Sequence, residues 1–301
     1  MRTKRNGLFF PAVGFVCASV ISAATVAAGP IHEAARAGDV ARVQLLLGAD
    51  PGLVDTVDNF GETPLFIAAN HNQLEVARLL IGQHADVNQT GVMYVAAVCG
   101  NVDMVKLLLK AGGNPNGRAK HTGGTALSAV FASGNRGPKY LEIAQFLIDA
   151  GADVKLRDER GRSALDIAAE NGSLPGVEFL TSHGSDPNDR SQLTGDTALH
   201  RAAENGFPDV VAALLVKGAN PNAQNLVGNA PLHYAGLLPT RVSTVTHPNR
   251  SRDQVTIAEL LINHGAEVNI RTKSGQPPLF YAKRTNSTEL VLFLERAGAV
   301  D

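Results

Sequence analysis

Titratable side chains gather in the segment GDTALHRAAENG at residues 195–206, and their types are those of acid–base catalysis. Five polar residues in this segment could take part: Asp196, Thr197, His200, Arg201 and Glu204. A histidine between two carboxylates could pass a proton to or from a bound substrate. Because the same spacing also fits a structural helix, the surrounding elements must decide between a catalytic cluster and a scaffold.

The segment recurs along the chain, which favours a scaffold. Close copies are GETPLFIAANHN at 61–72 and GRSALDIAAENG at 161–172. The first residue of the Ala-Ala position is residue 34, 68, 96, 130, 168, 202, 235 and 282 in turn, giving separations of 34, 28, 34, 38, 34, 33 and 47. A period of 33 to 34 residues predicts a solenoid of stacked repeats. The position of His200 holds Phe66 and Phe280 in other copies, which a catalytic role would not permit.

Three separations depart from this period. The value of 28 indicates that about five residues are missing between Asn88 and Met93, where the turn of the third copy should lie. The value of 38 indicates a short insertion near 135–139, and 47 an insertion of about 14 residues around 238–253. We expect the stack to be weakest between the second and third copies.

A second block follows each copy, as in VARLLIGQHADVN at 76–88. With these blocks the chain closely resembles the ankyrin-repeat family, whose pattern is a Gly turn, Thr-Pro-Leu-His, a helix with Ala-Ala, a helix with Leu-Leu, and Gly-Ala-Asp-x-Asn. The resemblance covers residues 31–301. It implies an all-α fold, an α-solenoid of about eight repeats that each combine a helix-turn-helix with a β-hairpin or loop. Repeats 1 to 8 then lie at about 31–57, 58–88, 89–119, 120–156, 157–190, 191–224, 225–271 and 272–301.

The repeat pattern has physical reasons. A hydroxyl just before the first helix can accept a hydrogen bond from a free backbone N–H, which predicts N-caps at Thr63, Thr125, Ser163 and Thr197. One position of the second helix is leucine in every copy and is expected in the core: Leu46, Leu80, Leu108, Leu147, Leu180, Leu214, Leu261 and Leu294. The histidine of the Thr-Pro-Leu-His position, His200 or His233, is expected to bond to the backbone of a neighbouring hairpin.

The N-terminus has the three parts of a secretory signal peptide. Basic residues at 2, 4 and 5 precede an apolar run from Leu8 to Ile21, and small residues follow at 22–30. Cleavage is expected after Ala28 or Ala24, with retention as a membrane anchor as the alternative. The expected organisation is a signal peptide at 1–28 and a solenoid at 29–301, in a bacterial protein that is periplasmic or secreted.

The net charge, the cysteine count and an incomplete zinc-binding motif argue against several classes of function. Without residues 1–28 the chain has 27 − 3 = 24 basic and 28 acidic residues, a net charge of −4, which argues against nucleic acid as a partner. Cys99 is then the only cysteine, so no internal disulfide can form. His32-Glu33 begins like a zinc-protease helix, but Arg36 stands where the second histidine is needed. We expect a monomeric, non-catalytic protein without a metal or cofactor.

In ankyrin-like proteins, the hairpin tips and the exposed face of the first helices form the concave binding surface, and this resemblance implies a protein partner. The corresponding positions are Asn59, Phe60, Glu62, Asn70 and His71 in repeat 2; Glu159, Arg160, Arg162, Glu170 and Asn171 in repeat 5; Leu193, Thr194, Asp196, Arg201, Glu204 and Asn205 in repeat 6; and Leu226, Val227, Asn229, Tyr234 and Leu237 in repeat 7.

Several alternatives stay open. Leu193, Leu226, Val227 and Leu237 could form an exposed apolar strip, or the insertion at 242–253 could fold over the strip and bury it. A secreted effector that acts on a host protein is a second role in the same binding class. An enzyme with a site in the insertion at 238–253 is the alternative from another class, although that segment lacks a paired base and nucleophile.

Overall fold

The computed structural model describes residues 29–132, 137–236 and 250–301, and in these ranges the chain is helical without a β-strand. The first helices of the pairs are α1 (Pro30–Ala37), α3 (Pro64–Asn70), α5 (Val92–Val98), α7 (Ala126–Ala132), α9 (Ala164–Glu170), α11 (Ala198–Asn205), α13 (Pro231–Ala235) and α15 (Pro278–Arg284). The second helices are α2 (Val40–Ala49), α4 (Leu74–Gly82), α6 (Val102–Lys110), α8 (Pro138–Asp149), α10 (Leu174–Ser182), α12 (Pro208–Val216), α14 (Arg250–Asn263) and α16 (Thr288–Arg296). A short 3-10 helix, η1 (Pro51–Asp55), follows α2.

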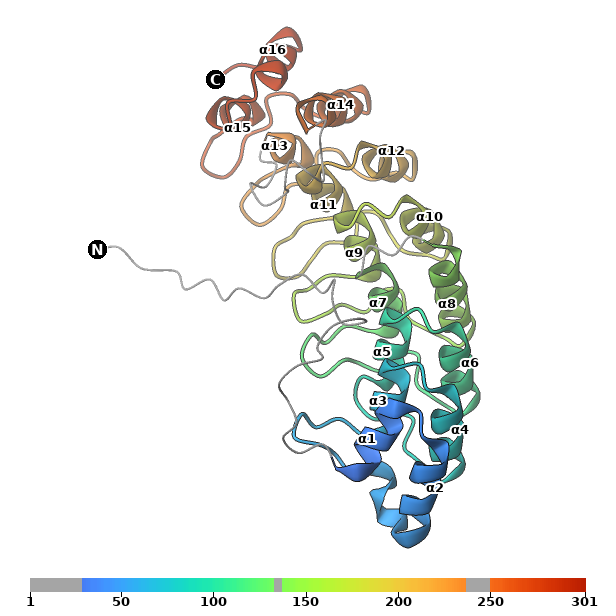
Figure 1. Ribbon diagram of the computed structural model, residues 1–301. Helices are drawn as coiled ribbons and strands as arrows, with labels where there is room; N and C mark the ends of the chain where they lie inside the picture. The colour runs from blue at the N-terminus through green and yellow to red at the C-terminus, as the bar shows by residue number, and fades with distance from the viewer. Residues whose placement is uncertain (1–28, 133–136, 237–249) are drawn as a thin grey trace, which may run out of the picture.

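The helix pairs stack into a curved solenoid (Figure 1). The odd-numbered helices form one row and the even-numbered helices a second row, and the loops between pairs extend from the odd-numbered side. This side is concave, because the stack bends toward the loops from α1 to α16. The predicted all-α solenoid is confirmed, whereas the predicted signal peptide at 1–28 lies outside the described residues.

Side-chain caps start the first helices as the sequence predicts. The hydroxyl oxygens of Thr63, Thr125 and Ser163 each accept a hydrogen bond of 3.2 Å from a backbone N–H three residues on. Repeat 6 differs, because Oγ1 of Thr197 lies 2.9 Å from Nδ1 of His200 instead. The cap position therefore serves two purposes: it starts the helix in repeats 2, 4 and 5, and it orients a buried imidazole in repeat 6.

Small and branched residues fill the core between the two rows of helices. The leucine position is at most 1% exposed in seven repeats, at Leu80, Leu108, Leu147, Leu180, Leu214, Leu261 and Leu294. The prediction is wrong for repeat 1, where Leu46 is half-buried and Leu47 is 5% exposed. No repeat packs on the outer side of α2 within the described residues, so the terminal helix turns a different leucine toward the core.

The resemblance implied a β-hairpin or a loop between helix pairs, and the connections take the second form, as tight turns. Within the described ranges, only an isolated bridge between Arg118 and Thr125 has strand pairing. Each turn is closed by an N–H to C=O bond of 2.8–3.0 Å between its first and last residues, and we call these segments the hairpin turns: 58–62, 119–124, 158–162, 191–196, 225–229 and 272–276. Gly61 and Gly228 have φ of 75° and 84°, a backbone that disfavours any side chain.

Asparagine side chains staple five of the seven junctions between repeats. At the junction of repeats 1 and 2 the Asp55 carboxylate accepts from the N–H of Asp86 at 3.1 Å instead. The amide nitrogen of each asparagine donates to a glycine carbonyl of the following repeat at 2.8–3.5 Å. The amide oxygen accepts from the backbone N–H of the residue two positions after that glycine, at 2.7–2.8 Å. The stapling residues are Asn88, Asn116, Asn188, Asn222 and Asn269. Because Asn88 keeps its staple, the junction of repeats 2 and 3 is tied at this point despite the missing hairpin turn.

One junction lacks its staple. Lys155 stands at the asparagine position between repeats 4 and 5, and its side chain makes neither bond in the described part of the chain. A cavity of about 170 Å³ opens there, lined in part by Lys155, Ser185 and Asp186. The Ser185 hydroxyl is buried in it without a hydrogen-bond partner. We therefore expect this junction, and not the stapled junction of repeats 2 and 3 that the period alone indicated, to open first in hydrogen exchange.

Replacing Lys155 with Asn is expected to restore the staple. The backbone N–H of residue 155 already bonds to Oδ1 of Asp153 at 2.8 Å, as the N–H of Asn116 bonds to Asn114, so the asparagine needs no backbone change. Two added hydrogen bonds should raise the free energy of unfolding by about 1–2 kcal/mol. Urea denaturation measures this change. Lys155→Ala is the control, and a gain as large in the alanine variant would contradict the staple.

Candidate partner-binding surface

Large apolar side chains lie exposed at the tips of three hairpin turns. Their exposed fractions are 65%, 60%, 53% and 58% for Phe60, Leu193, Leu226 and Val227. Asn59 is also exposed, and Thr194 is half-buried beside Leu193. Leu193 packs over the turn glycine Gly161 of repeat 5, and the apolar tips of repeats 6 and 7 therefore follow the turn of repeat 5 in succession. These residues lie on the surface as the sequence predicts.

Repeat 5 contributes ion pairs to the concave face. Arg162 bonds to Asp158 at 2.8 Å and to Glu170 at 2.8 Å, which ties its hairpin turn to the end of α9. These carboxylates raise the pKa of the Arg162 guanidinium against the opposing effect of burial, which is the largest single influence. Glu159 and Arg160 are exposed at the tip of the same turn.

Asp196 is not an outward surface residue, and that prediction is wrong. Its side chain is 6% exposed, and its carboxylate accepts from Arg201 at 3.0 Å and Asn225 at 2.7 Å, with the hydroxyl of Tyr234 at 3.4 Å. The turn of repeat 7 covers it, so the charge is neutralised by Arg201 and kept from water. The Glu204 carboxylate accepts from the other terminal nitrogen of the Arg201 guanidinium, Nη1, at 3.4 Å. The Glu204 side chain is one-third exposed, and burial raises its pKa.

Asn229 is also buried, at 9% exposure, contrary to its predicted outward position. It closes the turn at 225–229, where its N–H donates to Oδ1 of Asn225 at 3.0 Å. Tyr234 is half-buried, and burial together with the charge of Asp196 raises its pKa to about 12. Leu237 lies outside the described residues, so the structure describes three of the four members of the predicted strip: Leu193, Leu226 and Val227.

In repeat 2, two of the predicted residues, Glu62 and His71, lie near Arg36 of α1. Burial, followed by the charge of Asp58, raises the pKa of Glu62, whereas Arg36 lowers it. Burial and Arg36 both lower the pKa of His71, although this side chain is exposed at the end of α3. Asn70 is half-buried with its side-chain oxygen 3.7 Å from Sγ of Cys99. This end of the surface therefore carries mixed charge.

Two predicted asparagines hold helix ends instead of pointing freely outward. Nδ2 of Asn171 donates to the carbonyls of Phe131 and Ile167 at 3.0 Å each, which links repeats 4 and 5. Nδ2 of Asn205 donates to the carbonyl of Arg201 at 2.9 Å. Both residues are half-buried, and their amides are already hydrogen-bonded within the chain.

The histidines of the central segment are structural. His200 is fully buried, with Nδ1 at 3.0 Å from the N–H of Thr197 and Nε2 at 3.0 Å from the carbonyl of Asn229. His233 bonds in the same way to the carbonyl of Gln276 at 3.2 Å. The predicted bond from histidine to the neighbouring turn is confirmed. Burial lowers the pKa of both imidazoles, to about 4 for His200.

Sequence reasoning missed a buried ion cluster in repeat 5. Asp166 takes the position of His200 and accepts from Arg157 at 3.0 Å, while Arg157 also bonds to Asp189, at the end of the same repeat, at 2.6 Å. Ser163 donates to the same carboxylate through its N–H at 2.8 Å. Burial raises the pKa of Asp166, while Ser163 and Arg157 lower it. An acid in place of the repeated histidine, with an arginine before the turn, is the signal that could have found this cluster.

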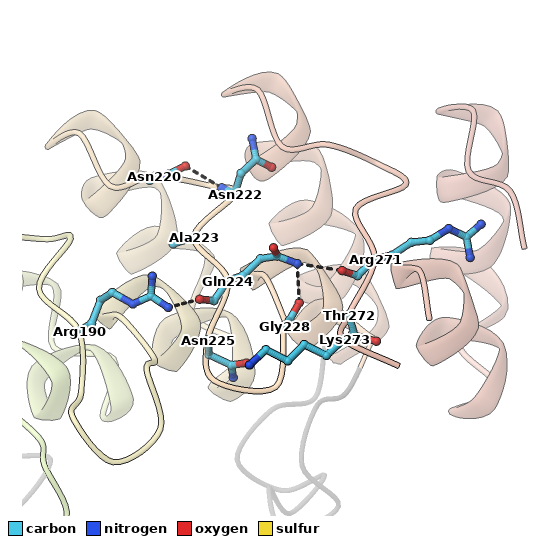
Figure 2. Close-up of a pocket in the computed structure, with 10 residues that line it drawn as sticks. All are labelled: Arg190, Asn220, Asn222, Ala223, Gln224, Asn225, Gly228, Arg271, Thr272 and Lys273. Carbon is cyan, nitrogen blue, oxygen red and sulfur yellow. Dashed lines mark hydrogen bonds between the residues drawn. The ribbon is translucent and has the colours of Figure 1, made fainter. Parts of the chain in front are cut away.

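A row of long side chains precedes the hairpin turns and holds them in place. Arg118, Gln224 and Arg271 each donate to the carbonyl of the glycine in the turn that follows them, at 2.7–2.8 Å. Each side chain also donates to a second backbone carbonyl at 2.6–3.0 Å: Arg118 to Arg157, Gln224 to Arg271, and Arg271 to Asp301. Figure 2 shows Gln224 at the centre, with Arg190 donating to its carbonyl. A cavity of about 520 Å³ lies here, lined by Arg190, Arg271 and Lys273 but no carboxylate. Its guanidinium groups bond to backbone carbonyls, which favours a structural role.

The described residues show neither a metal-binding group nor a membrane-spanning helix. Among the described residues, no group of three His, Cys, Asp or Glu side chains is close enough to hold a metal ion. None of the helices in the described ranges is long and apolar enough to cross a bilayer. Most of the insertion at 238–253, where the enzyme alternative was placed, lies outside the described residues.

Comparisons with known proteins agree with this architecture. A model of three ankyrin repeats matches residues 31–119 and 112–191, and a model of the single ankyrin repeat matches 194–226 and 227–273. The chain is 29% identical over 164 residues to the probable 26S proteasome regulatory subunit p28 of Saccharomyces cerevisiae, covering 52% of this chain and 70% of that protein. It is 30% identical over 251 residues to the B-cell lymphoma 3 protein homolog of Mus musculus, covering 79% and 51%.

A third relative, inversin of Homo sapiens, is 28% identical over 172 residues, which cover 56% of this chain and 16% of inversin. The chain thus spans about half of the mouse relative and a small part of inversin. The family models together span most of the chain, from residue 31 to 273. Stacked helix pairs, buried leucines and asparagine staples match this result, and the chain therefore belongs to the ankyrin-repeat family.

Proposed function

We propose that this chain is an exported, non-catalytic, monomeric scaffold that binds a protein partner. The contact surface is formed by the hairpin turns and the exposed face of the first helices, in repeat 2 and in repeats 5 to 7. The relative in yeast is named as a regulatory subunit of the proteasome, which is a protein assembly, and this supports a protein partner. The excess of acidic residues disfavours nucleic acid.

The observation that carries the proposal is the exposure of Leu193, Leu226 and Val227 on adjacent hairpin turns. Each is more than half exposed, and next to them Arg201 and Glu204 supply charge at the edge. An apolar centre with a polar rim is the usual composition of a protein interface. The buried network of Asp196 and Asn225 holds the turns in place, so little conformational entropy is lost on binding.

Replacing Leu226 and Val227 together by serine is expected to weaken partner binding by about tenfold or more, because apolar contacts at an interface centre are lost. The thermal midpoint should change little, since both side chains are exposed. Affinity capture from the native compartment, followed by titration of the captured protein, measures the effect. Val216→Ser is the matched control, because Val216 is 77% exposed at the end of α12, on the even-numbered row. Equal binding by the double variant and by the control would exclude this surface.

Export rests on the N-terminal sequence alone. The basic residues, the apolar run and the small residues support a cleaved signal at 1–28 and a periplasmic or secreted protein. The relatives described above come from eukaryotes, so they do not bear on this point. Mass spectrometry of the protein from its native compartment should find an N-terminus after Ala28 or Ala24. A protein recovered with residues 1–24 intact from the cytosol would contradict export.

A further inference from the structure

Backbone hydrogen bonds join the hairpin turns of neighbouring repeats. In each case the N–H of the second residue of one turn donates to the carbonyl of the residue before the glycine in the preceding turn. The pairs are Glu159 to Thr122 at 3.0 Å, Leu226 to Thr194 at 2.9 Å and Lys273 to Val227 at 3.1 Å. In these three pairs the turns stack like short strands, with one turn supplying an edge to the next. Among the described residues, the turns of repeats 5 and 6 do not make the equivalent bond.

Repeat 3 has no hairpin turn, and the turns of repeats 2 and 4 consequently face each other across a notch. The positions equivalent to the bonding atoms are the carbonyl of Phe60 and the N–H of Lys120, and neither makes a backbone hydrogen bond within the described residues. The Lys120 ammonium reaches toward repeat 2, since a methyl group added at Gly61 would lie 3.0 Å from it. The missing turn thus leaves one free acceptor and one free donor on opposite walls.

A cavity of about 570 Å³ lies on the repeat 3 and repeat 4 side of this notch, and its lining does not include the turn of repeat 2. Met93 and Tyr94 of α5 line it, together with Gln89, Thr90, Arg118 and Lys120. Arg118 already bonds to two backbone carbonyls, whereas Lys120 has no carboxylate within ion-pair distance among the described residues. With Glu159 as the single acidic group in the lining, the two cations leave an excess of one positive charge.

We propose that an extended segment of a partner protein, carrying an Asp or Glu side chain, binds in this notch in place of the missing hairpin turn. This rests on the proposed function as a protein-binding scaffold. The segment accepts a hydrogen bond from the N–H of Lys120, donates one to the carbonyl of Phe60, and places its carboxylate on the Lys120 ammonium. Addition of an extended chain to free backbone groups is an established mode of peptide recognition. Phe60, 65% exposed beside the notch, offers an apolar contact to the same segment.

The charge of Lys120 provides the first test. Random short peptides displayed on phage are selected on the full chain, and the peptides recovered are synthesised and titrated by fluorescence polarisation. We expect them to carry Asp or Glu, and to lose about tenfold or more in affinity on Lys120→Gln, because a charge-assisted hydrogen bond is removed. Lys273→Gln is the matched control: Lys273 takes the same place in the turn of repeat 8, whose neighbour is present. Failure to recover peptides, peptides without a carboxylate, or equal affinity for both variants would each overturn the proposal.

The backbone provides the second test. In amide hydrogen exchange, a bound peptide is expected to slow exchange at the N–H of Lys120 while leaving that of Lys273 unchanged. Unaltered exchange at Lys120 would contradict strand addition even if peptides bind. Self-association of the chain that disappears in Lys120→Gln would assign the notch to a second copy and also overturn the proposal. If the captured partner still responds to the Leu226 and Val227 double variant while every peptide test fails, the scaffold function stands and only the notch proposal fails.

Discussion

Replacing Arg157 by methionine is expected to lower the free energy of unfolding by about 3–5 kcal/mol at neutral pH, the usual cost of leaving one member of a buried ion pair unpaired. The Arg157 side chain is 14% exposed and bonds to Asp166 at 3.0 Å and Asp189 at 2.6 Å. It also donates to the carbonyl of Gly161 at 2.8 Å. Its removal leaves the Asp166 carboxylate, 5% exposed, with Ser163 as its remaining partner.

The loss in Arg157→Met should decrease as the pH is lowered. Burial already raises the pKa of Asp166, and removing the neighbouring cation raises it further. Because a carboxyl with a raised folded-state pKa takes up its proton more readily in the fold, the variant recovers stability toward acid pH. Urea denaturation over a pH series measures both effects.

The matched control is Arg160→Met, in the same hairpin turn. Arg160 is exposed, and its change is expected to stay within about 0.5 kcal/mol. The double variant Arg157→Met with Asp166→Asn should regain part of the loss, since a neutral amide replaces the unpaired charge. Equal losses in Arg157→Met and Arg160→Met would show that the cluster does not stabilise the fold.

Acidification is expected to destabilise the protein through His200. Burial lowers the pKa of this imidazole from its usual 6.5 to about 4, so the fold favours the neutral form. A depressed folded-state pKa gives stability that is present above pH 6.5 and is lost as the pH falls through about 4. The difference corresponds to about 3 kcal/mol. His233, whose pKa burial also lowers, adds to the same trend.

His200→Gln separates this contribution from the other titrating groups. The variant should lose less stability than the original protein between pH 6.5 and 4, by about 3 kcal/mol, whatever its stability at neutral pH. The free energy of unfolding from urea titrations at both pH values is the measurement. His121→Gln, an exposed histidine in the turn of repeat 4, should behave like the original protein. If all three proteins respond to pH alike, His200 is not the group responsible.

The period of 33 to 34 residues already determined much of this protein. It predicted the helix pairs, the caps at Thr63 and Ser163, the buried leucines and the structural role of His200. These features depend on contacts within a repeat or between equivalent positions of neighbours, which a repeated sequence displays directly. The exposed tips at Phe60 and Leu226 followed for the same reason, because turn tips point away from the stack.

Only the tertiary structure decided which polar side chains are covered. Asp196 and Asn229 vary between copies like surface residues, yet the turn of repeat 7 buries the first and closes through the second. Whether a polar residue is exposed depends on the particular neighbour that packs on it, and periodicity contains no information about that neighbour. The same holds for the missing staple at Lys155 and for the free donor at Lys120, which become visible only when adjacent repeats are placed side by side.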